Sequence, residues 1–230
     1  MIQSTTIDTP DGKMEVMLGI PEGTGPFPAL VVAHHRDGLD KFTRHILTRL
    51  ASNGFVGAAP NFYHRLPAGT VVRDYVGGLL DDQLVIDVKA TADHLKTLSN
   101  VSPNSLGIIG HCMGGRVAFL GAATYPFKAS VMLYGGGVPQ SGAGGSAPAL
   151  TRAAGINCPV LGFSGRDDKR PSPEDMATIS AELKRLGKQH DFHVYDGAAH
   201  AFQNIYDPRY REHASEDAWR RLLPFLREHL

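Results

Sequence analysis

The segment Leu106-Gly-Ile-Ile-Gly-His-Cys112-Met-Gly-Gly115 decides the fold. Its first four residues form an apolar run, which predicts a short buried strand over Leu106–Ile109, and a helical pattern follows from Cys112 to about Ala123. A strand that turns at once into a helix needs small residues beside the turn, and glycines lie two residues before and two residues after the cysteine. The segment therefore predicts a strand, a sharp turn and a helix, with Cys112 at the apex of the turn.

Strands and helices alternate on both sides of this segment. Ser4–Ile20 has the alternation of two strands joined at the Asp11-Gly12 turn, and the later apolar runs are each followed by a helical pattern or a loop. Further strands are expected at Ala29–Ala33, Phe55–Ala59, Ser130–Leu133, Val160–Ser164 and Phe192–Tyr195, and further helices at Phe42–Leu50, Leu79–Leu95, Glu174–Leu186 and Glu212–Glu228. This order predicts an α/β fold with a mostly parallel, doubly wound sheet, an antiparallel hairpin at its edge, and one domain over residues 1–230.

Two segments leave alternatives open. Pro224 lies inside the last helical pattern, where a proline removes a backbone donor, so we expect it to kink or divide the helix. Gly135–Ala147 is rich in glycine and small polar residues and is expected to be a flexible loop. This loop is either a plain connection or a flap near the active site.

The bulk composition favours a small-molecule partner. Among 230 residues the formal net charge is zero, so no field steers the chain toward nucleic acid or an anionic membrane. The start of the chain lacks the features of a secretory signal, and no segment has the roughly 20 apolar residues that cross a bilayer. We therefore expect a cytoplasmic protein, either a monomer or a homodimer. Two cysteines are too few for a disulfide scaffold.

The turn around Cys112 has the spacing of the G-x-S-x-G nucleophile elbow of α/β-hydrolases, with cysteine in place of serine. Thiolate is the reactive form of cysteine, and the N-terminus of a helix favours negative charge. The same geometry offers the backbone N–H of Met113 to an oxyanion. The alternative is a small buried core cysteine, which is the assignment we give to Cys158 because no glycines frame it.

In α/β-hydrolases an acid and a histidine follow the nucleophile along the chain. Asp167 and Asp168 come after the strand Val160–Ser164, and either could be the acid. His200 follows the strand Phe192–Tyr195 and precedes the final helix, which selects it among the 11 histidines. We expect the imidazole to move the thiol proton and the carboxylate to fix its tautomer.

On these residues the sequence resembles the dienelactone hydrolase family. The matching segments are Gly110-His-Cys-Met-Gly-Gly115, Gly165-Arg-Asp-Asp168-Lys-Arg-Pro-Ser-Pro-Glu174, Tyr195-Asp-Gly-Ala-Ala-His200-Ala-Phe202 and Ala59-Pro-Asn-Phe-Tyr-His-Arg65. The resemblance favours Asp168 over Asp167. It implies hydrolysis of a small ester or lactone by a Cys-His-Asp triad through a covalent acyl-enzyme, with no cofactor and no metal.

The resemblance also assigns further residues. The backbone N–H of Arg36 would be the second oxyanion donor, and His35 stands near the thiol where well-known members have a glutamate. Those members hold a substrate carboxylate with two arginines; Arg73 is a candidate for one position, and Asn204 occupies the other. Phe202 is a further candidate substrate contact. These departures fit a neutral or bulkier ester as well as a dienelactone.

Three other functions remain open at this stage. One is promiscuous hydrolysis of other esters, thioesters or phosphotriesters with the same triad. Another is a non-catalytic small-molecule binder. The last is a metal site formed by His34, His35, Asp37 and Cys112, although no spacing typical of metal ligands supports it.

Overall fold

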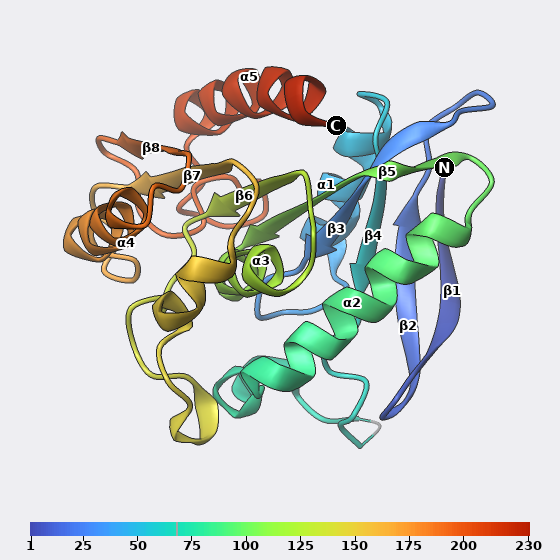
Figure 1. The fold of residues 1–230 in the computed structure, drawn as a ribbon, viewed down its shortest axis with the longest axis horizontal. Coiled ribbons are helices and arrows are strands. Elements are labelled where there is room, and N and C mark those ends of the chain that lie inside the picture. Colours follow the sequence, from blue (N-terminus) through green and yellow to red (C-terminus); the bar gives the residue numbers. More distant parts are fainter. Residues whose placement is uncertain (68) are drawn as a thin grey trace.

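The protein is built around one eight-stranded sheet, seen in a computed structural model that describes residues 1–67 and 69–230 (Figure 1). The strands are β1 (Ile2–Thr9), β2 (Gly12–Gly19), β3 (Phe27–Ala33), β4 (Val56–Pro60), β5 (Val101–His111), β6 (Ala129–Leu133), β7 (Val160–Gly165) and β8 (His190–Tyr195). Their order is β1-β2-β4-β3-β5-β6-β7-β8. The strands from β4 to β8 in this order are parallel, and β2 joins β4 antiparallel.

The hairpin expected at the edge of the sheet is present. β1 and β2 pair antiparallel from Ile2 opposite Gly19 to Thr9 opposite Gly12, and β1 is the edge strand. Gly12 has φ of 123°, a conformation that glycine adopts without strain. The hairpin and the parallel strands together confirm the predicted α/β-hydrolase type of sheet.

Helices cover both faces of the sheet. They are α1 (Lys41–Ala51), α2 (Asp81–Thr97), α3 (Met113–Thr124), α4 (Pro173–Arg185) and α5 (Glu212–His229). The buried residues of α1 and α5 belong to one apolar cluster, and those of α2, α3 and α4 belong to the other. Figure 1 shows α5 on one side of the sheet and α2, α3 and α4 on the opposite side. The sheet is therefore doubly wound, as predicted, and its central strands are buried on both faces.

Local sequence signals fix where two of the helices begin. The side chain of Asp40 accepts hydrogen bonds from the backbone N–H groups of Phe42 (3.0 Å) and Thr43 (2.9 Å) and caps α1. Ser172 and Asp175 form a reciprocal capping box at the start of α4, with Pro173 at its first position. Both caps follow loops that carry candidate site residues, so they hold those loops in place.

The structure corrects one expectation about the last helix. α5 runs from Glu212 to His229 as one helix with Pro224 inside it, so the proline does not divide it. Trp219 and Leu222 before the proline and Leu226 after it are all buried in the same apolar cluster. This packing on both sides of Pro224 holds the helix together where the isolated sequence would favour a break.

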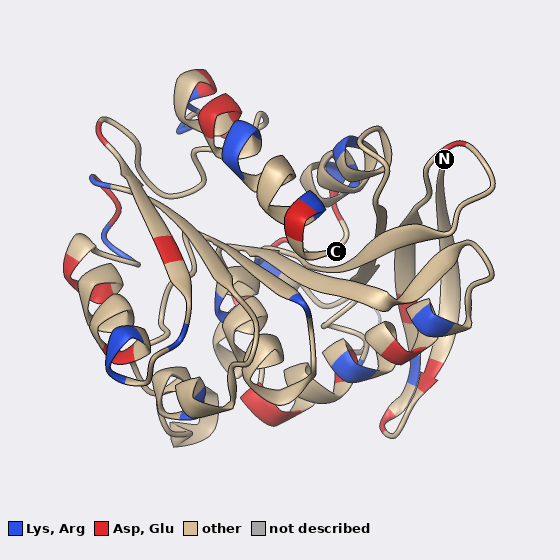
Figure 2. Ribbon diagram, turned by 45° about the horizontal axis from the view of Figure 1, so that its top comes forward, with Lys and Arg blue, Asp and Glu red and all other residues tan. Residues whose placement is uncertain are grey.

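Charged residues of both signs are interspersed along the helices in Figure 2, with no large region of one sign on the face drawn. Within the described part of the chain, no helix is long and apolar enough to cross a membrane.

Candidate active site

The candidate site residues gather at one edge of the sheet. His35 and Arg36 follow β3, Cys112 follows β5, Asp168 follows β7, and His200 lies in the loop after β8. These four strands are parallel members of one sheet, so their carboxyl ends lie along the same edge. The structure thus brings together residues that are up to 165 positions apart in the sequence, from 35 to 200.

The predicted strand-turn-helix segment is present. β5 ends at His111 and α3 begins at Met113, so Cys112 alone forms the turn, with φ of 58° and ψ of −122°. The backbone is fixed by a hydrogen bond of 3.0 Å from the N–H of Cys112 to the carbonyl of Leu133. A non-glycine residue held in this sparsely populated region is a mark of a functional turn.

His200 is paired with one of the two candidate acids. Its Nδ1 lies 2.8 Å from a carboxylate oxygen of Asp168, whose other oxygen accepts a hydrogen bond of 2.8 Å from the backbone N–H of Arg170. Asp168 is buried, whereas its neighbour Asp167 is exposed and contacts Ala198 only through its backbone N–H. Of the two acids left open by the sequence, Asp168 is therefore the one that contacts the histidine.

Tyr134 supports the histidine from the end of β6 and was not singled out from the sequence. Its ring packs edge-on against the ring of His200, with centroids 5.2 Å apart, and it also packs on Phe202. Burial raises the pKa of Tyr134 well above its usual value, so the side chain stays neutral. A tyrosine directly after a buried strand gives no motif by which its role could be predicted.

The surroundings of Cys112 favour its charged form. Burial alone would raise the pKa of the thiol, but His200 and the backbone N–H groups of Met113 and Arg36 outweigh burial and lower it. Burial would lower the pKa of His200, yet Asp168 and Cys112 raise it to about 9. Both shifts favour the charged forms of the pair, a thiolate and an imidazolium.

These shifts predict how the reactivity of the Cys112 thiol depends on pH. The thiol of Cys112 is expected to lose its proton below pH 9.0, which is the ordinary pKa of a cysteine thiol. The imidazolium of His200 keeps its proton up to a pH of about 9. The rate of alkylation by iodoacetamide, followed by mass spectrometry, should therefore have its acidic midpoint below 9.0. In His200→Ala the midpoint should rise, because burial then acts without the imidazolium.

A midpoint in the unmodified protein at or above the ordinary value would contradict the ion pair. The other cysteine provides an internal comparison, since Cys158 is buried and burial raises its pKa to about 11. Its alkylation should lag behind that of Cys112 at every pH tested.

His35 lies near the thiol, as the resemblance implies, but it contacts acids. Its Nε2 is 3.0 Å from a carboxylate oxygen of Asp40 and its Nδ1 is 3.5 Å from one of Asp37. These contacts hold the ring on the wall of the pocket that also contains Cys112. Asp37 and Asp40 flank the two ring nitrogens, so the ring is surrounded by residues close to it in the sequence.

The four-residue metal site considered from the sequence is not assembled. Both ring nitrogens of His34 are engaged by the backbone, at 2.6 Å from the carbonyl of His35 and 3.2 Å from the N–H of Phe62. Over residues 1–67 and 69–230, the one group of ligand atoms close enough to share an ion is His35, Asp37 and Asp40, without Cys112. Asp37 and Asp40 approach opposite nitrogens of the His35 ring.

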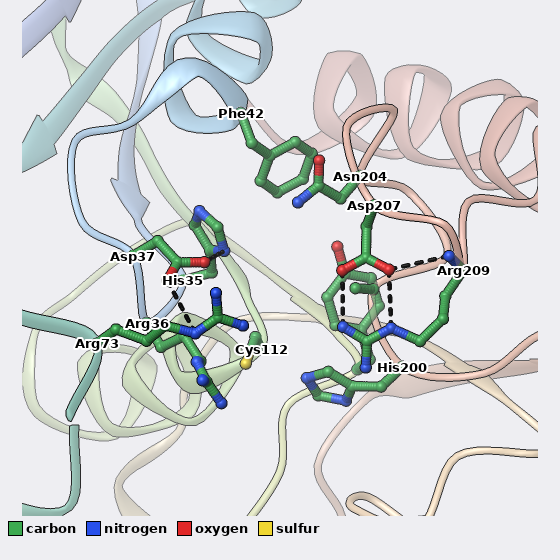
Figure 3. A pocket seen from close by; sticks show the side chains of 12 residues that line it. His35, Arg36, Asp37, Phe42, Arg73, Cys112, His200, Asn204, Asp207 and Arg209 are labelled. Carbon is green, nitrogen blue, oxygen red and sulfur yellow. Dashed lines mark hydrogen bonds and ion pairs between the residues drawn. The ribbon is translucent and has the colours of Figure 1, made fainter.

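Two cavities meet at Cys112 and His200. The first, which we call the small pocket, is lined by His35, Arg36, Asp37, Phe42, Arg73, Cys112, Tyr134, His200, Ala201, Asn204, Asp207 and Arg209. Figure 3 shows the sulfur of Cys112 between Asp37 and Arg73 on one side and His200 and Arg209 on the other. Arg73 lies 3.6 Å from Asp37, and Arg209 makes hydrogen bonds of 2.8 and 2.7 Å to Asp207. The positive charges of the two arginines are thus each matched by a carboxylate.

The second cavity, which we call the large cavity, has a volume of about 610 Å³. It is lined by Arg36, Gly77, Leu79, Asp81, Leu84, Cys112, Met113, Arg116, Val117, Gly136, Gly137, Ser141, Gly142, Ala143, Asp168, Lys169, Arg170 and His200. Five of these residues belong to the glycine-rich loop 135–147. The loop is therefore a wall of the site, which is where the flap alternative places it.

A buried ion pair anchors this loop. Arg116, in the first turns of α3, lies 2.6 Å from the carboxylate of Asp81 at the start of α2. Its guanidinium also donates to the carbonyl of Gly137 and, at 3.4 Å, to that of Gln140. Arg116 was not predicted as a site residue, because an arginine just after the elbow carries no signal of a partner that is 35 positions away.

The predicted substrate contacts differ in their placement. Arg73 and Asn204 line the small pocket, and the carboxamide oxygen of Asn204 accepts a hydrogen bond from the N–H of Tyr206. The prediction that Phe202 contacts substrate is wrong. Its side chain is fully buried in the core between Tyr134 and Tyr195 and lines neither cavity. Arg209 does line the small pocket, although the sequence did not point to it.

A doubly wound sheet with a cysteine elbow after β5 and a paired acid and histidine after β7 and β8 defines the class of α/β-hydrolases. Within that class the chain belongs to the dienelactone hydrolase family, whose model matches residues 14–230. The resemblance stated from the sequence is therefore confirmed, and with it the expectation of a hydrolase.

Individual relatives agree with this assignment. A protein of Methylorubrum extorquens named "Putative carboxymethylenebutenolidase" is 31% identical over 227 residues, which cover 95% of this chain and 78% of the relative. The crystal structure of a "Putative Dienelactone Hydrolase" from Klebsiella pneumoniae matches with a TM-score of 0.89 and 27% identity. The match covers 99% of this chain and 98% of that one. A dienelactone hydrolase-like promiscuous phosphotriesterase from metagenomic libraries has the same fold, with a TM-score of 0.82, 23% identity and coverage of 99% and 98%.

Proposed function

We propose that the protein hydrolyses a carboxylic ester or lactone with Cys112 as nucleophile, His200 as acid and base, and Asp168 as the group that orients the histidine. The observation that carries this proposal is the hydrogen bond of 2.8 Å between Asp168 and His200, made beside a cysteine held at the apex of a strained turn. The name of the Methylorubrum relative supports a lactone or ester as the substrate class.

The first half of the reaction forms an acyl-enzyme. The thiolate of Cys112 attacks the carbonyl carbon, and the carbonyl π electrons move onto oxygen. The N–H groups of Met113 and Arg36, which already stabilise the negative thiolate, are placed to donate to this oxyanion. When the carbonyl re-forms, the bond to the alcohol oxygen breaks, and the leaving alkoxide takes a proton from Nε2 of the His200 imidazolium.

The second half releases the acid. His200, now neutral, accepts a proton from water while the water oxygen attacks the thioester carbon. Collapse of this second tetrahedral intermediate breaks the carbon–sulfur bond and returns the electron pair to sulfur. The products are the carboxylic acid and the original thiolate and imidazolium. Every proton in this cycle comes from water or from His200, so the cycle balances without a cofactor.

Asp168 determines which nitrogen of the ring does this work. Its carboxylate accepts from Nδ1 of His200, which leaves Nε2 for the thiol and the leaving group. The carboxylate also stabilises the imidazolium that the resting pair contains. This arrangement argues against a non-catalytic binder, because a pocket that only binds has no need of an oriented acid-base group.

Replacing Asp168 tests the proposal, and the neighbouring acid supplies the control. Asp168→Asn should lower kcat/KM for p-nitrophenyl acetate by about 10²–10³-fold, because the amide no longer fixes the ring or balances its charge. Asp167→Asn should stay within about twofold of the unmodified enzyme, since the Asp167 side chain is exposed and its contact with Ala198 is through the backbone. Equal losses in the two variants would show that the acid next to His200 has no special role.

The same two N–H groups could donate hydrogen bonds to the phosphoryl oxygen of a phosphotriester, so turnover of activated phosphotriesters and thioesters remains a prediction of the sequence. Assaying these substrates beside p-nitrophenyl acetate would rank the three classes.

A further inference from the structure

The large cavity and the small pocket lie on two sides of the same thiol. Cys112, His200 and Arg36 line both spaces, while the remaining lining residues differ. An ester carbon bound at sulfur carries two substituents that diverge, one on the acyl side and one on the alcohol side. The two cavities are arranged to receive one substituent each.

The walls of the large cavity are mainly apolar. Leu79 lies just before α2 and Leu84 in its first turns, Met113 and Val117 belong to α3, and Ala143 belongs to loop 135–147. The volume of about 610 Å³ lies in the range of sites that bind drug-sized ligands. Apolar walls around a space of this size favour a bulky apolar group, because burying it removes apolar surface from water.

The charges of the large cavity are not balanced within it. Its two acids are already engaged, Asp81 with Arg116 and Asp168 with His200. Its other cations, Arg36, Lys169 and Arg170, form no ion pair within the residues that the structure describes. In addition, Nε of Arg36 is buried and has no hydrogen-bond partner among them. Arg36 also lines the small pocket, but the other two arginines there, Arg73 and Arg209, each have a carboxylate partner.

We propose that the large cavity is a subsite for a bulky apolar substituent of the ester that carries a negative charge, with Arg36, Lys169 and Arg170 as its charge contacts. This inference rests on the proposed ester hydrolysis and names the substrate class for the same site. Arg36 is half-buried, whereas Lys169 and Arg170 line the cavity with exposed side chains. Leaving the buried Nε of Arg36 without a partner is costly, and an anionic ligand supplies that partner. The apolar body of that ligand then fills the space between α2, α3 and the loop.

Five esters would test the subsite. Vinyl acetate is the small reference; 2-naphthyl acetate and its 6-carboxylate carry the bulk on the alcohol side, and vinyl 2-naphthoate and its 6-carboxylate carry it on the acyl side. In the unmodified enzyme, the carboxylate of at least one pair should exceed its neutral analogue by about tenfold in kcat/KM. Using both pairs removes the need to know which substituent enters the cavity.

Filling the cavity tests the apolar part. Ala143 lines the cavity from loop 135–147, whereas Ala147 in the same loop is exposed and lines neither cavity. Ala143→Phe should lower kcat/KM for both members of the preferred pair by about tenfold and leave vinyl acetate within about twofold. The control variant Ala147→Phe should leave all five esters within about twofold.

Removing charge tests the anionic part. The double variant Lys169→Gln with Arg170→Gln should lower the preference for the carboxylate, because only Arg36 remains as a charge contact. The neutral member should stay within about twofold, because Arg170 supports Asp168 through its backbone N–H, which the substitution keeps. Lys169→Arg should keep the preference. Arg166→Gln is the control, since Arg166 is exposed, pairs with Asp196 and lines neither cavity.

The outcomes separate this inference from the proposed function. The subsite is wrong if neither carboxylate has a higher kcat/KM than its neutral analogue. It is also wrong if Ala143→Phe lowers kcat/KM for vinyl acetate as much as for the naphthyl esters. The proposed hydrolase still stands in that case if the unmodified enzyme turns over vinyl acetate and Cys112→Ala does not. If the unmodified enzyme hydrolyses none of the five esters, the proposed function itself fails.

Discussion

Replacing Cys112 with alanine is expected to lower kcat/KM for p-nitrophenyl acetate by at least about 10³-fold. The variant keeps His200, Asp168 and the two N–H donors, but it has no atom that can form the covalent intermediate. In the unmodified enzyme, rapid acid quenching and mass spectrometry should find an acetyl group on the peptide that contains Cys112. The alanine variant should show neither the burst of nitrophenol nor the labelled peptide.

Cys158→Ala is the matched control for this experiment. Cys158 is buried, lines neither cavity and has a pKa that burial raises to about 11, so it is a packing residue. Its loss should leave kcat/KM within about twofold. An acetyl label on another residue, or full activity of Cys112→Ala, would overturn the assignment of the nucleophile.

Gly114→Ala is expected to destabilise the whole protein, by at least about 3 kcal/mol. A Cβ at position 114 would lie 2.0 Å from the carbonyl oxygen of Ala33 and 2.7 Å from that of His34. Ala33 is the last residue of β3 and His34 follows it. Ala33 pairs with Gly110 of the neighbouring β5, so this backbone cannot move away at low cost. Thermal unfolding should show a melting temperature lower by about 10 °C, or no folded protein.

The control for this prediction is another glycine of the site. Gly77 lines the large cavity, and a Cβ there would meet no atom within 4 Å, so Gly77→Ala should change the melting temperature by less than about 2 °C. A Gly114→Ala protein that melts with the unmodified one would show that α3 can shift away from β3 without loss.

The elements, and the positions of Cys112 and His200 in loops at one edge of the sheet, could be predicted from the sequence because they depend on local signals. Apolar runs of strand length gave the parallel strands, and the Asp11-Gly12 turn gave the hairpin. Cys112 and His200 were found because a sharp strand-to-helix turn restricts its neighbours to glycine, and because the fold fixes the order of its functional loops. Asp168 was chosen over Asp167 only by resemblance, since adjacent acids in a loop have the same local signal.

Features that depend on tertiary contacts could not be predicted from the sequence. β5 begins at Val101, five positions before the predicted Leu106, because Val101 pairs with Phe27 on the neighbouring strand. Packing holds α5 together across Pro224. Arg209 reaches the small pocket through the path of the loop after His200, and no pattern in the sequence encodes that path. Phe202 lies two residues after His200 in the sequence, yet its side chain packs in the core.

The pairing of Arg116 with Asp81 has a mechanical consequence. Arg116 is three residues from Met113, whose backbone N–H favours the thiolate form of Cys112. The guanidinium of Arg116 that pairs with Asp81 also donates hydrogen bonds to the carbonyls of Gly137 and Gln140. One side chain therefore connects loop 135–147 to the first turns of α3, so a change in the position of the loop would be felt beside Cys112.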